Sequence, residues 1–174
     1  YLDQIAGLPA LTPGELEALT LSAMAGEPGA PGRLTEAYLG QVADIAKLYT
    51  GQVVPVEDLI GEGNLALAAG SRLLSGLKDP EEARGMLARR IMDAMELHIR
   101  EAEENGRTDQ KAADKVNRVA DRARELAGDL RRKVTPDELA RETGMSLKSI
   151  QEAVRISGYK IEDIEDVQDS VSGL

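Results

Sequence analysis

The chain has 174 residues, enough for one substantial hydrophobic core or for two small cores in series. The sequence contains no Phe, no Trp and only four Tyr, and this aliphatic composition suits helix-on-helix packing and predicts an all-α fold. The lack of Cys excludes disulfides and thiolate metal sites, and the net charge of −10 opposes tight binding to duplex DNA except where Lys and Arg gather locally.

Local signals predict four helices in the first part of the chain. Residues Thr12 to Glu15 form a capping box with Pro at the first helical position, because the Thr hydroxyl can accept an amide proton of the first turn. The Gly- and Pro-rich stretch 26–32 ends this helix, and Gly51 is the expected end of the second. The helices are expected over residues 13–25, 34–50 and 56–74, and from Pro80 until the chain frays near Asn105-Gly106.

The second part of the chain predicts a smaller helical unit. Apolar residues recur at steps of three and four, which indicates one stripe along a helix formed by Val116, Val119, Ala123, Leu126 and Leu130. A second capping box at Thr135 opens a short helix, and Gly144 turns the chain into a last helix that buries Ile150, Val154 and Ile156. This spacing resembles a helix-turn-helix, which also occurs in hairpins that never bind DNA. We therefore expect domains at 1–106 and 107–159, followed by a loose acidic tail at 160–174.

No catalytic or metal-binding pattern is found in the sequence. His98 is the single histidine, and the carboxylates lie at solvated helical spacing beside Lys or Arg that can pair with them. We therefore expect a protein that is not an enzyme and that needs no cofactor, metal or small-molecule substrate. No apolar run is long enough to span a membrane, so we expect no membrane contact and, by default, a cytoplasmic location.

A basic stripe is the first candidate binding surface. Steps of four, four, three and four place five cations on one helical face, opposite the apolar stripe: Arg107, Lys111, Lys115, Arg118 and Arg122. The stripe is either a solvated face with Asp114 and Asp121 interleaved or a ridge that follows nucleic-acid phosphates. The helix after Gly144 is not strongly basic, so specific recognition of duplex DNA by that helix is not favoured.

The helix expected at 56–74 is the second candidate surface. Asp58, Glu62 and Asn64 are expected near one another, and the buried side is expected to consist of Leu59, Ile60, Leu65 and Leu67. Gly61 and Gly63 each cost a helix roughly 1 kcal/mol relative to Ala. A helix with such glycines usually allows close approach by a neighbouring helix or by a partner protein, and both alternatives stay open.

Four blocks of the chain resemble, in order, the housekeeping class of bacterial RNA polymerase sigma factors. Residues 1–12 resemble that family's first conserved region, 36–51 the start of its second, and 116–146 its third, a small three-helix unit. The most distinctive block is very similar to the family's polymerase-docking helix and runs Asp58-Leu59-Ile60-Gly61-Glu62-Gly63-Asn64-Leu65-Ala66-Leu67. The resemblance covers nearly the whole chain, and it implies a sigma-like second domain followed by a third-domain-like unit.

The resemblance implies a partner and a set of contact residues. In the family, the docking helix binds a coiled coil of the RNA polymerase clamp, and the matching positions here are Leu39, Asp58, Glu62 and Asn64. Three neighbouring positions depart from the family, where a Leu, a Gln and a Met are replaced by Glu57, Gly61 and Ala68. Losing large side chains weakens an interface whose binding energy is concentrated in a few anchors.

The chain also departs from the family after the docking helix, where it lacks the family's aromatic residues. Sigma factors follow the docking helix with aromatic side chains that stack on unpaired bases of the minus-ten element, at about 1–3 kcal/mol per base. No aromatic residue occurs here between Tyr49 and Tyr159, so promoter melting is not expected to carry over. Arg89 and Arg90 remain as candidates for weak contact with promoter phosphates.

Three hypotheses for function follow. The leading one is a divergent sigma-like transcription initiation factor that docks on the RNA polymerase core and contacts promoter DNA weakly. The second is a regulatory decoy that binds polymerase or a sigma-related partner without initiating transcription. The third is a helix-turn-helix DNA-binding module that uses residues 107–157.

Overall fold

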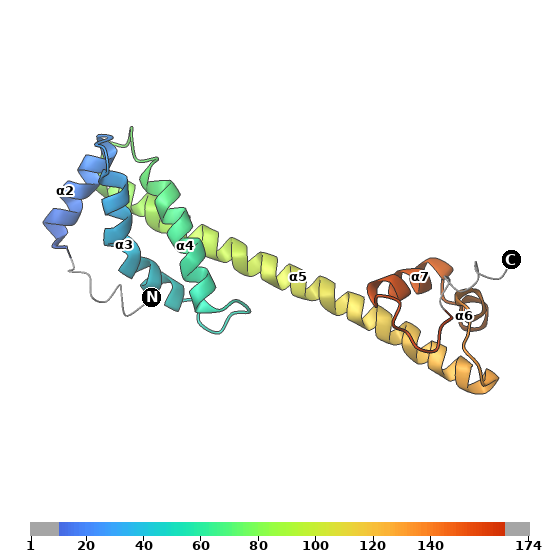
Figure 1. Ribbon diagram of the computed structural model, residues 1–174. Coiled ribbons are helices and arrows are strands. Elements are labelled where there is room, and N and C mark those ends of the chain that lie inside the picture. Colours follow the sequence, from blue (N-terminus) through green and yellow to red (C-terminus); the bar gives the residue numbers. More distant parts are fainter. Residues whose placement is uncertain (1–10, 166–174) are drawn as a thin grey trace. The chain divides into compact units, whose positions relative to one another are not determined.

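The computed structural model describes residues 11–165 and is helical throughout this range, apart from turns and one isolated β-bridge. The helices are α2 (Pro13–Met24), α3 (Ala30–Lys47), α4 (Val56–Ser71), α5 (Pro80–Leu130), α6 (Pro136–Thr143) and α7 (Leu147–Ile156) (Figure 1). The expected all-α fold class is therefore confirmed. The chain divides into two compact units, an N-terminal unit at Tyr1–Glu104 and a C-terminal unit at Asn105–Leu174. Residues 1–10 of the first block of the family resemblance (1–12) lie outside the described residues, as does the end of the expected tail, at 166–174.

The N-terminal unit packs α3 against both α2 and α4, with the first part of α5 completing the core (Figure 1). The capping box before α2 is confirmed, because the Thr12 hydroxyl accepts from the Glu15 amide and the Glu15 carboxylate accepts from the Thr12 amide. The first part of α5 presents a buried residue every four positions. The largest fully buried side chains of this unit are Leu34, Val42, Leu59, Leu67, Leu74, Leu87, Ile91 and Met95.

Several helix boundaries differ from those expected, and among them α3 ends at Lys47 rather than at Thr50 and α4 ends at Ser71 rather than at Leu74. The helix α3 begins at Ala30 rather than at Leu34, because Gly29 takes the left-handed conformation (φ 80°) and Pro31 suits the first helical turn. The helix α5 does not fray at Asn105-Gly106 but continues through both residues to Leu130. Both residues are exposed, and a single Gly costs an exposed helix only about 1 kcal/mol, which the long flanking segments can tolerate.

The C-terminal unit joins the last part of α5 to α6 and α7. Its buried side chains are smaller than those of the first unit and include Val119, Ala123, Val134, Leu139, Ile150, Ala153 and Ile164. Leu130 and Ile156, expected on buried stripes, are instead 46% and 49% exposed because each lies at or next to the end of its helix.

The segment after Lys160 also differs from the loose tail that we expected. Ile161 and Ile164 are buried in the core of the C-terminal unit. Val134 and Ile164 form the isolated β-bridge, in which the Val134 amide donates to the Asp163 carbonyl and the Glu165 amide donates to the Val134 carbonyl, both at 2.9 Å. Residues 160–165 are therefore a packed part of this unit.

Candidate functional site

The helix α4 has one buried side and one exposed side. Leu59, Ile60 and Leu67 are buried as expected, but Leu65 is 68% exposed and the prediction that it is buried is wrong. The helical repeat explains this, because Leu65 lies about 20° around the helix from the exposed Asp58 and far from Leu67. The prediction rested on the apolar side chain of Leu65, whereas the angular position of Leu65 on the helix places it among the exposed residues.

The four expected docking residues do not form a single cluster. Asp58 is exposed and Glu62 half-buried, and they stand one turn apart on the same face of α4. Asn64 is half-buried about 160° around the helix from Glu62, at the other edge of the exposed side. Leu39 is half-buried on α3, the helix that packs against α4. Any partner that touches all four residues must therefore cover the width of α4 and reach α3.

Gly61 and Gly63, two of the three glycines of α4, have different surroundings. A Cβ atom at Gly63 would lie 2.5 Å from Met95 Cε and 2.6 Å from Val42 Cγ1, so this glycine permits close packing of α4 against α5 and α3. A Cβ atom at Gly61 would meet nothing within 4 Å, and Gly61 is exposed. The alternative of intramolecular packing is therefore correct for Gly63, whereas nothing inside the chain requires Gly61.

The exposed side of α4 forms a continuous strip, which we call the α4 strip. It consists of Glu57, Asp58, Gly61, Leu65 and Ala69, with the half-buried Ala68 at one edge. On the other edge, Glu62 Oε1 lies 4.0 Å from His98 Nδ1 of α5, and both side chains are about 35–40% exposed. This contact is attractive only when His98 is protonated, and at this distance and exposure it is weak. The strip and its edge thus offer three carboxylates (Glu57, Asp58 and Glu62), one large apolar side chain and a flat position at Gly61.

The expected phosphate contacts in the N-terminal unit are both exposed. Arg89 and Arg90 lie side by side on α5, and the Arg90 stem passes α4 where a Cβ atom on Gly70 would lie 3.2 Å from Arg90 Cδ. The described tyrosines of this unit do not replace the missing aromatic residues. Tyr38 is buried, and the Tyr49 hydroxyl donates to Glu96 Oε1 at 3.0 Å. Burial and the nearby Glu96 carboxylate raise the pKa of Tyr49 above its ordinary value.

The basic stripe of α5 is divided by the packing of the C-terminal unit. Lys115 Nζ lies 2.7 Å from Glu152 Oε2 of α7, and Arg122 Nη1 lies 2.7 Å from Glu125 Oε2 on its own helix. Lys111 and Arg118 are exposed and line, with Ser149, a cavity of about 220 Å³ between α5 and the start of α7. Arg107 is also exposed. The stripe is therefore not a uniform ridge, and its most accessible part lies around Lys111 and Arg118.

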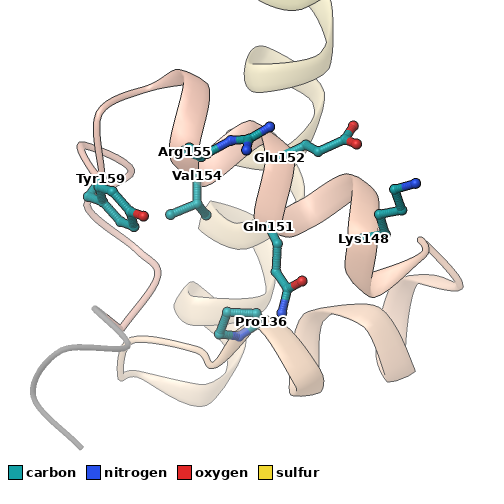
Figure 2. A pocket seen from close by; sticks show the side chains of 7 residues that line it. All are labelled: Pro136, Lys148, Gln151, Glu152, Val154, Arg155 and Tyr159. Atoms are coloured by element: carbon teal, nitrogen blue, oxygen red, sulfur yellow. The ribbon is translucent and has the colours of Figure 1, made fainter.

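A larger cavity of about 450 Å³ borders the last helix, α7. Figure 2 shows Pro136, Val154 and Tyr159 around one side of it, with Gln151 beside Pro136 and Lys148, Glu152 and Arg155 along α7. The helix-turn-helix geometry before it is regular, because Gly144 is left-handed (φ 72°) and the Ser146 side chain caps α7.

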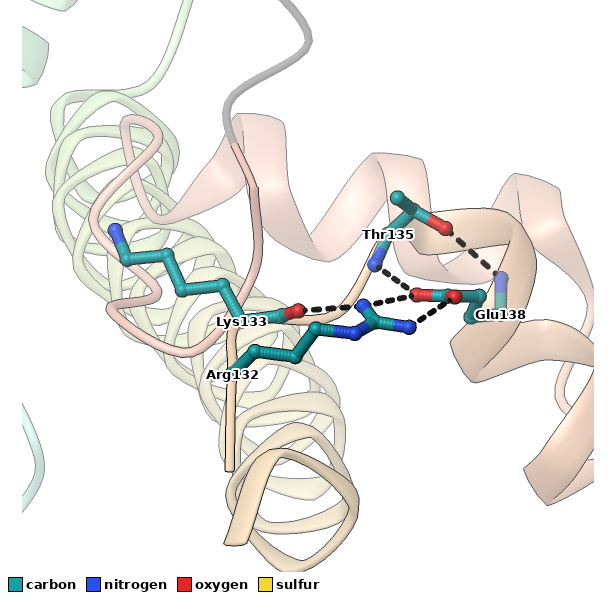
Figure 3. Close-up of polar contacts among 4 residues, drawn as sticks. All are labelled: Arg132, Lys133, Thr135 and Glu138. Atoms are coloured by element: carbon teal, nitrogen blue, oxygen red, sulfur yellow. Dashed lines mark hydrogen bonds and ion pairs between the residues drawn. The ribbon is translucent and has the colours of Figure 1, made fainter. Parts of the chain in front are cut away.

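The second capping box lies at the start of α6, next to Pro136, which lines this cavity. Thr135 accepts from the Glu138 amide, and Arg132 donates to both Glu138 oxygens at 2.6 and 3.0 Å (Figure 3). The Arg132 hydrogen bonds and the backbone hydrogen bond from Thr135 lower the pKa of Glu138 from its ordinary 4.5 to about 2. The box predicted at Thr135 is confirmed, but the sequence did not indicate that Arg132 joins it.

A protein-family model matches the C-terminal part of the chain. Residues 114–160, which include α6, α7 and the end of α5, match the family described as sigma-70 region 3. Among the described residues, no helix is long and apolar enough to cross a membrane. Within the same range, no group of three or more His, Asp or Glu side chains is arranged to hold a metal ion.

Alignments with individual curated proteins cover most of the chain. The RNA polymerase sigma factor SigA of a Bacillus species is 29% identical over 160 residues, which are 90% of this chain and 41% of that protein. SigA of Listeria monocytogenes is 30% identical over 90% of this chain and 42% of its own length, and SigA of Clostridium acetobutylicum is 29% identical over a similar share. The chain thus spans about two fifths of the length of the curated relatives it matches. The resemblance to housekeeping-type bacterial sigma factors is confirmed, and the chain is related in sequence to that family.

Proposed function

We propose that this chain is a divergent sigma-like transcription factor that docks on RNA polymerase through the α4 strip. The observation that carries the proposal is an exposed α4 surface bearing Asp58 and Glu62, in a chain related to proteins named as RNA polymerase sigma factors. The chain acts by binding and not as an enzyme. Its partner surface is the coiled coil of the polymerase clamp that the family resemblance implies.

The shape of the strip favours a weaker contact than that of the family. Side chains at interfaces contribute unequally, and a few buried anchors carry most of the binding energy. Gly61 and Ala68 offer no side chain that could insert into a partner pocket, and Glu57 adds a carboxylate that must be desolvated. The exposed Leu65 is the strip's one large apolar anchor, so we expect docking to depend on Leu65 together with Asp58 and Glu62.

Contact with DNA is a secondary part of the proposal. Arg89 and Arg90 in one unit and Lys111 and Arg118 in the other are exposed, whereas Lys115 and Arg122 are engaged by carboxylates. Each accessible cation can release a counterion on binding a phosphate, but the net charge of −10 opposes the approach of DNA. We therefore expect weak contacts with promoter DNA that form after polymerase docking has brought the DNA close.

A decoy is the second candidate, and the distribution of aromatic residues favours it. Between Tyr49 and Tyr159 the sequence contains no Phe, Trp or Tyr ring that could capture an unpaired base. A protein of this kind could occupy polymerase without opening a promoter. The helix-turn-helix module is less favoured, because Lys115, central to its basic face, is paired with Glu152.

Recovery of core RNA polymerase by the immobilised chain tests docking. We expect the intact chain to retain polymerase and the double variant Asp58→Ala/Glu62→Ala to lose most of it. The matched control is Glu17→Ala/Glu101→Ala, which removes the same charge from two exposed positions on other helices of the N-terminal unit. If the intact chain retains no polymerase, or if both double variants behave alike, docking through the α4 strip is refuted.

Transcription from the docked complex separates the factor from the decoy. Polymerase loaded with this chain is supplied with linear promoter templates and, in parallel, with templates that carry a pre-opened minus-ten bubble. A factor that opens the promoter yields transcripts from the linear duplex, and a factor without melting function yields them only from the pre-opened template. A decoy yields none from either template and reduces transcription by an added housekeeping sigma factor in proportion to its concentration.

A further inference from the structure

The cavity beside α7, which we call the Tyr159 cavity, has the size of a small-molecule site. Its volume of about 450 Å³ falls within the roughly 300–1,000 Å³ typical of ligand pockets. Pro136 and Val154 supply an apolar floor, and both are buried except where they face the cavity. Polar and charged groups stand at the rim (Figure 2). An apolar floor with a few convergent polar groups is the usual composition of a ligand site.

Tyr159 has an unusual backbone and an open ring. Its φ of 62° lies in the left-handed region, which is unfavourable for a residue with a Cβ atom, and its amide donates to the Val154 carbonyl at 2.9 Å. Its side chain nevertheless lies on the surface, where the residue is 58% exposed. Of the three tyrosines that the structure describes, Tyr38 is buried and Tyr49 is tied to Glu96. Tyr159 therefore has the ring most available for stacking, and the fold holds it at the cavity edge.

The charges at the rim favour an anion. Lys148 and Arg155 are exposed on either side of Glu152 along α7. Glu152 is itself matched by Lys115 at 2.7 Å, and this hydrogen bond lowers the pKa of the Glu152 carboxyl. The rim is thus locally cationic in a chain of net charge −10. Gln151 adds an amide that can both donate and accept hydrogen bonds beside the apolar floor.

We propose that the Tyr159 cavity binds a nucleoside phosphate. The base stacks on the Tyr159 ring above Pro136 and Val154, Gln151 hydrogen-bonds the base edge, and Arg155 with Lys148 holds the phosphate. This site lies apart from the α4 strip and does not depend on polymerase docking. An acidic peptide would use the two cations but would leave the open ring and the amide without a role, so the arrangement favours the nucleotide. The nucleotide is either free in solution or the end of a single strand.

Binding to the full chain tests the proposal with two nucleotide probes. The first is ATP, measured by isothermal titration calorimetry, and the second is a fluorescein-labelled oligo-dT strand, measured by anisotropy. We expect saturable binding, which Tyr159→Gly weakens at least about tenfold because the stacked base is lost. Glycine tolerates the left-handed backbone, so this variant removes the ring without straining the chain. Tyr159→Phe keeps the ring and should bind nearly as well as the wild type.

Charge variants and a peptide probe complete the test. Arg155→Gln should weaken binding and reduce its salt dependence, whereas the matched control Arg124→Gln removes an exposed α5 cation outside the cavity and should change neither. Equal affinity for ATP and the strand identifies a free nucleotide, and tighter binding of the strand identifies a strand end. The proposal is overturned if neither probe binds or if Tyr159→Gly binds as well as the wild type. Preferential binding of a hexaglutamate peptide at this cavity also overturns it.

Discussion

The two units of this chain are stabilised by different means. The N-terminal unit buries large aliphatic side chains from four helices and brings α4 so close to its neighbours that only Gly fits at position 63. The C-terminal unit has a smaller core rich in Ala and Val, and it adds polar connections between segments. Among these are the Arg132–Glu138 and Lys115–Glu152 ion pairs and the bridge from Val134 to Ile164. A small core leaves more of the stability to caps and ion pairs, which respond to pH and salt.

This difference bears on function, because each unit carries its candidate surface in a different way. The α4 strip is the outer side of a helix whose inner side is locked by close packing. The Tyr159 cavity depends on α7, on the turn after it, and on Pro136 at the start of α6. We therefore expect the α4 strip to keep its shape under conditions that loosen the Tyr159 cavity.

Truncation of the smaller core gives the largest expected effect. Ile150 is fully buried in the C-terminal unit, and Ile150→Ala should lower the free energy of unfolding by about 2–5 kcal/mol. Amide hydrogen exchange should show the loss of protection in α6 and α7, with α3 and α4 little changed. Equal loss of protection in both units would contradict the division of the molecule into two separately stabilised parts.

Substitution of Gly63 and of Gly61 by Ala should give the next largest effects on stability, and the two effects should have opposite signs. Gly63→Ala should destabilise the N-terminal unit by about 1–3 kcal/mol, because the added methyl group overlaps Val42 and Met95. Gly61→Ala should stabilise it by up to about 1 kcal/mol, because Ala favours the helix and meets no neighbour. Urea denaturation of the two variants measures the contrast. If both variants are stabilised, the close packing inferred at Gly63 is wrong.

Acidification should weaken the C-terminal unit through Glu138. Because the folded pKa of about 2 lies below the ordinary 4.5, Glu138 stabilises the fold above pH 4.5 and loses this contribution as the pH falls from about 4.5 to about 2. Glu138→Gln should flatten the dependence of stability on pH in this window, while Asp137→Asn, at the exposed neighbouring position, should not. Thermal unfolding at stepped pH values, followed by circular dichroism, measures the difference.

The smallest expected effect belongs to the Lys115–Glu152 ion pair. Both side chains are about one third exposed, so a double-mutant cycle with Lys115→Gln and Glu152→Gln should give a coupling energy below about 1 kcal/mol. The coupling should fall further as salt is added, because screening acts on exposed charges. A coupling independent of salt would show that the pair is more enclosed than its exposure indicates.

Much of the fold and part of the candidate site could be predicted from local sequence. Thr12 and Thr135 open helices through contacts within three residues, so both capping boxes are evident without any tertiary information. The all-α fold class followed from composition and periodicity, and the order of the family blocks indicated α4 as the candidate docking helix. The exposure of Asp58 is likewise a local expectation, because a charged side chain is rarely fully buried unless it is paired.

What the sequence alone did not determine depends on neighbours distant along the chain. Only the packing of Val42 and Met95 separates Gly63, which must be small, from Gly61, which need not be. Lys115 belongs to a regular basic stripe in the sequence, yet Glu152 of α7 engages it in the fold. Ile161 and Ile164 lie in an acidic stretch but are buried in the core, where Ile164 forms a β-bridge with Val134. Local hydrogen bonds decide where a helix begins, whereas burial and ion pairing depend on which segments the tertiary structure brings together.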